Sequence, residues 1–155
     1  MDTNRMPRRR VSAARIGLVV YLVLLGLIVF LPAPDSGGVS GILGWMAHLV
    51  GRLGVPVYEA YVVLEFLANI VLFVPFGVLV PVVFPGLRPW MVVALGLLTS
   101  AGIELVQFVL PTRFPTVSDV VANTLGALIG CLWVAAVSRR AVRARAERDL
   151  VRSPI

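Results

Sequence analysis

The chain is dominated by long apolar stretches that a soluble fold of this size could not bury. Residues 16–31 form a nearly unbroken apolar run, and similar stretches follow at about 60–84, 89–110 and 118–137. The hydrophobic content is 59% of 155 residues, above the roughly 45–50% typical of soluble domains. Because a span requires about 20 mostly apolar residues, we expect an all-α membrane protein with four transmembrane helices.

The segment between the first two spans predicts a short amphipathic helix at about 40–53. Its apolar residues recur every three or four positions, opposite His48 and Arg52. This pattern favours a helix that lies on the membrane surface, with His48, the single histidine, in solvent. A cleaved signal peptide is the alternative for the first run, but residues 31–33 (Leu-Pro-Ala) match a cleavage site poorly.

The positive charge is concentrated at the two ends of the chain. All fourteen basic residues are arginines, and eleven of them lie in residues 1–15 and 138–155. This distribution predicts two cytoplasmic tails around a membrane domain at 16–137 and therefore an even number of spans. We expect the tails, the second of them helical, to touch anionic lipids. Nucleic acid is not an expected partner, although the net charge is +6.

The polar residues inside the spans are predicted to gather near the outer membrane face. A charge at the bilayer centre costs about 2.5–3.5 kcal/mol, so such residues usually face the bundle interior and mark function. Within each helix they are three or four positions apart, which places them on one face. The predicted ligand-binding residues of this cluster are Glu65, Asn69, Ser100, Glu104, Gln107, Arg113, Asp119 and Asn123.

Two interpretations of this cluster remain open. The side chains can bond one another as interhelical glue, with Arg113 neutralising Glu104 or Asp119. Alternatively, they form a site in which Arg113 holds an anionic group and the carboxylates provide acid, base or cation-binding groups. Three carboxylates face one arginine, so one of them would need a proton or a cation, which favours the site. Glu104, Asp119 and Arg113 are the candidates for catalysis.

Three further features receive structural interpretations. Gly126 and Gly130 form a GxxxG pattern, which we expect to pack helices closely within the chain. Cys131 lies in an apolar run and is expected to serve packing. Oxygen ligands suited to Mg²⁺ or Ca²⁺ are available, but no resident metal or cofactor is predicted. That oxygen set is Glu65, Asn69, Glu104, Asp119 and Asn123.

The same residues resemble the motifs of the VanZ-like family of small bacterial membrane proteins. The matching segments are NIVLFVPFG (69–77), SAGIELVQ (100–107), Arg113 and DVVANTLGALIG (119–130). The resemblance implies a cell-envelope protein whose founding member is associated with resistance to glycopeptides, chiefly teicoplanin. It implies no known reaction. Many members carry acidic residues where this chain has Thr116 and Ser118.

Three functions follow as hypotheses. The first is a non-enzymatic envelope protein whose outer cluster binds a lipid-linked anionic headgroup or an amphiphile. Its expected partners are membrane lipids and a lipid-linked cell-wall precursor or lipoglycopeptide. The second is an intramembrane enzyme acting on a lipid phosphate or glycolipid, with Glu104 or Asp119 as acid/base and Arg113 stabilising negative charge. The third is a small transporter, for which four spans would need to form a homo-oligomer.

Overall fold

The computed structural model describes residues 8–30, 41–109 and 116–152, and within them the chain is helical without strands. The helices are α1 (Arg8–Phe30), α2 (Gly41–Gly51), α3 (Val57–Val83), α4 (Pro89–Gln107) and α5 (Val117–Arg152). All but α2 are long and apolar enough to cross a membrane. The predicted fold class, four spans and a short helix between the first two, is confirmed.

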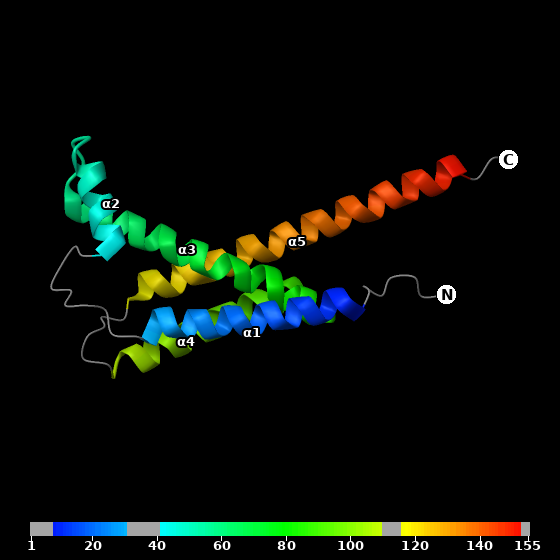
Figure 1. The fold of residues 1–155 in the computed structure, drawn as a ribbon, viewed down its shortest axis with the longest axis horizontal. Coiled ribbons are helices and arrows are strands. Elements are labelled where there is room, and N and C mark those ends of the chain that lie inside the picture. Colours follow the sequence, from blue (N-terminus) through cyan, green and yellow to red (C-terminus); the bar gives the residue numbers. More distant parts are fainter. Residues whose placement is uncertain (1–7, 31–40, 110–115, 153–155) are drawn as a thin grey trace.

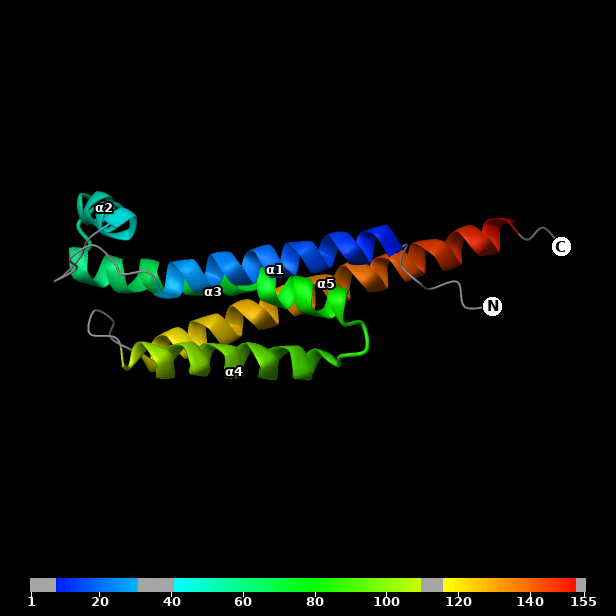
Figure 2. The ribbon, with the colours of Figure 1, turned by 60° about the horizontal axis from the view of Figure 1, so that its bottom comes forward.

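The four long helices lie side by side, and α2 lies at one end of them (Figure 1). The start of α1 and the last turns of α5 are at the opposite end, where α5 projects beyond its neighbours (Figures 1 and 2). We call these two ends of the bundle the α2 end and the tail end. The starts of α3 and α5 and the end of α4 lie at the α2 end (Figure 2).

The helix boundaries differ from the predicted spans mainly at the basic segments. Helix α1 begins at Arg8 and α5 continues to Arg152 without a break. Arginine and alanine both favour helix, so hydropathy locates the apolar part of a helix but not its end. Helix α4 ends at Gln107, three residues before the predicted position, and α3 begins at Val57, directly after Pro56.

Helix α3 is the centre of the bundle and packs against each of the other helices. Phe73 of α3 and Val92 of α4 are completely buried. On the α1 side, the Tyr21 hydroxyl donates to the Leu72 carbonyl over 3.0 Å. Pro75 lies within α3 and has no N–H for the helical hydrogen bond. The hydrogen bond from Tyr21 therefore holds α3 close to the position where one of its own backbone hydrogen bonds is missing.

Helices α3 and α5 approach each other through glycines. A Cβ added to Gly126 would clash with the Ile70 carbonyl, and one on Gly130 would lie 2.9 Å from the Val78 backbone nitrogen. On α3, a Cβ on Gly77 would clash with the Ala127 carbonyl. The two backbones are therefore in direct contact. The prediction that the GxxxG pattern packs helices within the chain is confirmed.

Large exposed aromatic residues mark both ends of the bundle. Trp45, Tyr58 and Phe108 are exposed toward the α2 end, and Trp90 and Trp133 toward the tail end. Aromatic side chains of this kind are enriched at membrane interfaces. Between Trp90 and Phe108, α4 rises about 27 Å at 1.5 Å per residue, close to the roughly 30 Å hydrocarbon thickness of a bilayer.

We expect Gly130→Ala to lower the free energy of unfolding by about 1–3 kcal/mol, because the added methyl group must separate two backbones in contact. Gly102→Ala is the matched control, since no atom lies within 4 Å of its added Cβ. It should stabilise the helix by about 0.5–1 kcal/mol. Thermal unfolding of both variants in detergent tests this; equal stability would contradict the close α3–α5 contact.

The arginine distribution predicts that the α2 end faces the outside of the cell. In a Cys131→Ala background, His48→Cys on α2 should react with a membrane-impermeant maleimide in intact cells. Ala144→Cys on the projecting part of α5 should react only after permeabilisation. Both positions are exposed, so access to the reagent depends on the side of the membrane. The reverse labelling pattern would refute the orientation.

Candidate functional site

Thr116 organises the α2 end of the polar cluster. It directly precedes α5, and its hydroxyl accepts a hydrogen bond from the Asp119 N–H over 3.2 Å, as an N-cap residue does. The Thr116 N–H donates to Glu104 Oε2 of α4 over 2.9 Å. In a reciprocal capping box, the carboxylate three residues into the helix would accept that N–H. Here Glu104 accepts it, which leaves the Asp119 side chain available to another helix.

The Asp119 carboxylate connects α5 to α3. Asn69 donates its side-chain amide to Asp119 Oδ1 over 2.8 Å. Glu104 and Asp119 are both partly exposed, and both contact Thr116. We call Asn69, Glu104, Thr116 and Asp119 the carboxylate layer.

One helical turn further into the bundle, Ser100 and Asn123 form a buried pair. Asn123 Nδ2 donates to Ser100 Oγ over 2.8 Å, and the two residues are 5% and 0% exposed. The other polar atom of this amide, Asn123 Oδ1, is buried without a hydrogen-bond partner among the described residues. A buried acceptor left unpaired costs about 1–3 kcal/mol, so this atom is suited to accept from a bound group or water. We call Ser100 and Asn123 the amide layer.

The remaining predicted site residues lie differently. Gln107 is buried, but its amide donates to the Val29 carbonyl of α1 over 3.2 Å, so it fixes α1 against α4. Glu65 is half-buried on α3 and has an interaction of its own. Arg113 lies outside the described residues.

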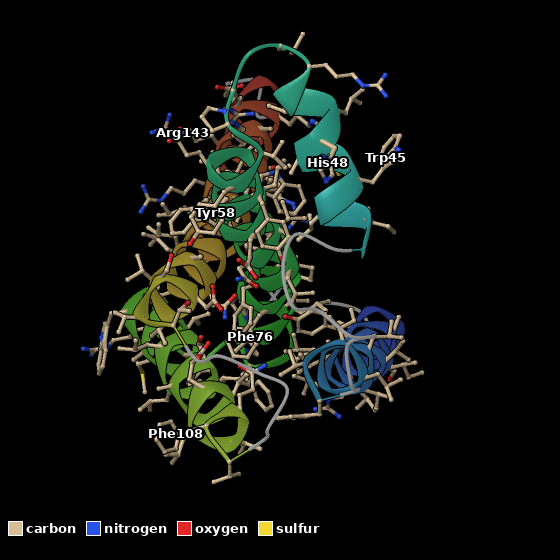
Figure 3. All side chains as sticks on the ribbon, turned by 90° about the vertical axis from the view of Figure 1, so that its left-hand side faces the viewer. Trp45, His48, Tyr58, Phe76, Phe108 and Arg143 are labelled. Carbon is tan, nitrogen blue, oxygen red and sulfur yellow. The ribbon has the colours of Figure 1, made fainter. Side chains whose placement is uncertain are left out.

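The polar layers occupy only the α2 half of the interior. Asn123 is six residues into α5, about 9 Å from its start at 1.5 Å per residue. The next contact toward the tail end is between Gly96 and Ala127, where a Cβ on the glycine would lie 2.7 Å from the alanine methyl. Beyond it the interior is apolar around Val83, Val92 and Cys131. In Figure 3, polar atoms lie between α3, α4 and α5, whereas Trp45 and Phe108 are on the outside.

The arrangement offers more acceptors than donors. Each carboxylate has about four acceptor positions, and among the described residues the hydrogen bonds from Thr116 and Asn69 leave positions open on both. Asn123 Oδ1 adds a further acceptor. In the described part of the chain, no group of three or more His, Cys, Asp or Glu side chains could hold a metal ion. The described arrangement is therefore suited to a hydrogen-bond donor or a cationic group.

Sequence reasoning missed Thr116 as a member of the cluster, because an uncharged residue outside the spans was treated only as a departure from a motif. The signal was present as Thr116-x-x-Asp119, a capping pattern that places the threonine hydroxyl at the N-terminus of α5. By contrast, no sequence pattern indicates that the Gln107 side chain contacts a backbone carbonyl of α1.

The comparisons agree with these motifs. The family profile VanZ/LLP1 matches residues 18–138, from the first turns of the α1 span to the projecting part of α5. No curated protein and no solved structure matches the chain significantly. Because the matched region is well over half of the 155 residues and covers most of the four-helix membrane region, the chain is a multi-pass membrane protein that belongs to the VanZ/LLP1 family.

Proposed function

We propose that the chain is a cell-envelope protein whose carboxylate layer binds the headgroup of an anionic lipid-linked molecule or an amphiphile at the outer membrane face. The observation that supports this most is the partial exposure of Glu104 and Asp119 at the α2 end, with acceptor positions left open. Polar side chains at the α2 end of the bundle can contact a lipid headgroup while they remain between the helices.

The anionic part of the headgroup is assigned to Arg113. This residue is three positions before Thr116, so covalent geometry keeps their Cα atoms within about 11 Å of each other, at no more than 3.6 Å per residue. A guanidinium binds a phosphate or carboxylate through two parallel hydrogen bonds. A phosphate at Arg113 would leave the rest of the headgroup near the carboxylate layer.

Family membership suggests which amphiphile to test. The founding member of the resembled family is associated with resistance to teicoplanin, an acylated glycopeptide with a polar head and a lipid tail. Such a molecule inserts its tail into the outer leaflet and presents its head at the level of the α2 end. The site proposed here would meet that head.

The polar distribution favours binding over transport. A path across the membrane would need polar groups in both halves of the bundle, but beyond the amide layer the described core contains residues such as Val80, Val83 and Val92. Enzyme chemistry has less support as well. The Ser100 hydroxyl, the buried hydroxyl of the amide layer, accepts from the Asn123 amide, which is not a base that could activate a nucleophile.

Arg113→Ala should weaken binding of a polyprenyl phosphate to the purified protein by about tenfold or more, because a charge-assisted hydrogen bond contributes about 1.5–3 kcal/mol. Arg52→Ala, an exposed arginine on the same end of the bundle, is the control and should bind normally. Scintillation proximity or native mass spectrometry measures both. Unchanged binding of the polyprenyl phosphate by Arg113→Ala would contradict the role of Arg113 in binding the anionic group.

Deletion of the gene should increase sensitivity to acylated glycopeptides more than to non-acylated ones, since only the former place a lipid tail in the outer leaflet. Minimum inhibitory concentrations of a matched pair measure the difference. Equal sensitivity to both classes would contradict the proposal that the antibiotic is a ligand. Headgroup binding would then be tested by the polyprenyl phosphate measurement alone.

A further inference from the structure

We propose that the carboxylate layer and Asn123 together recognise a primary ammonium group, so that the preferred headgroup is a phosphate-bearing lipid with a free amine. The inference rests on the proposed headgroup site and specifies the chemical class of its ligand. It is carried by acceptors on two successive helical turns that have positions without a donor among the described residues.

The first step concerns the orientation of the amide groups. Asn69 and Asn123 both direct an NH₂ group to another side chain, at Asp119 and Ser100 respectively. Gln107 directs its NH₂ group to the backbone of α1. The described contacts therefore use amide donors, and the Asn123 oxygen has no partner among the described residues, which favours a ligand that donates hydrogen bonds.

The second step concerns depth. Asn123 follows Asp119 by four residues on α5, and Ser100 precedes Glu104 by four residues on α4, so the two layers are adjacent turns of the same helix faces. Asn123 Oδ1 has no hydrogen-bond partner among the described residues, and only 5% of the residue is exposed. This acceptor is one turn deeper along α5 than Asp119.

The third step concerns charge. The described hydrogen-bond partners of Glu104 and Asp119 are the Thr116 N–H and side chain and the Asn69 amide, all of them neutral. Glu104 and Asp119 lie near enough to repel each other, which favours a cation beside them. A primary ammonium has one positive charge and three N–H donors, one for each carboxylate and one for Asn123. A quaternary ammonium has no N–H, and a hydroxyl has no charge.

The test uses the full chain in detergent with an equimolar mixture of phosphatidylethanolamine, phosphatidylcholine and phosphatidylglycerol of identical acyl chains. Native mass spectrometry should show phosphatidylethanolamine retained about tenfold over each of the others, the equivalent of one charge-assisted hydrogen bond. Soluble phosphoethanolamine should not displace it. If phosphoethanolamine does displace the lipid, the claim that the recognised amine belongs to a lipid is overturned.

Matched variants separate recognition from folding. Glu104→Gln still accepts from Thr116 but loses its charge, and should abolish the preference for phosphatidylethanolamine, whereas Glu59→Gln, exposed on α3, should keep it. Asn123→Leu should reduce the preference, while Thr124→Val, which removes a hydrogen bond within α5 to the Val120 carbonyl, should keep it. Thermal unfolding confirms that each variant is folded.

The outcomes distinguish the two proposals. If phosphatidylglycerol or polyprenyl phosphate binds as well as phosphatidylethanolamine, and Glu104→Gln changes nothing, the ammonium site is overturned while headgroup binding stands. If none of these lipids is retained, headgroup binding itself fails. Equal loss of the preference in Asn123→Leu and Thr124→Val would show a structural role for Asn123 and overturn its part in recognition.

Discussion

The direct backbone contact between α3 and α5 is the constraint on which the remaining structure depends. Gly77 on α3 and Gly126 and Gly130 on α5 allow an approach that any side chain would prevent. Since lipid tails are as apolar as the helices, close packing and interhelical hydrogen bonds must hold the bundle together. The contact also fixes the register: Asn69, next to Ile70 on α3, is 2.8 Å from Asp119, which lies two turns before Gly126 on α5.

Helix α4 completes the site because it runs antiparallel to α5 along the same register. Their contacts change in character along the pair. Near the α2 end they are polar, from Glu104 to Thr116 and from Ser100 to Asn123, and the next contact is a close approach of small residues. The polar half holds the helices by hydrogen bonds and the apolar half by packing. Over half the bundle, the predicted site residues and the helix contacts are therefore the same residues.

Much of this could be predicted from sequence because lipid imposes simple rules. Four apolar stretches give four spans, and spacings of three or four residues place Asp119 and Asn123 on one face. What spacing cannot supply is the partner across an interface. Gln107 shares the spacing of Glu104 yet bonds to a carbonyl of α1, and Thr116 joins the cluster through its backbone N–H. Such contacts depend on helix register, which small residues determine and hydropathy does not reveal.

Several residues contribute both to the fold and to the proposed site. A variant that loses function therefore does not by itself identify a binding residue. Asn69 contributes to α3–α5 packing through Asp119, so its removal would weaken the bundle as well as the proposed binding. Asn123 also serves the fold, because its amide NH₂ donates to Ser100 of α4. Its buried oxygen atom is different, since no contact among the described residues uses it. A buried acceptor without a donor lowers stability, and a bound donor would offset that cost, which is the physical basis of the proposed recognition.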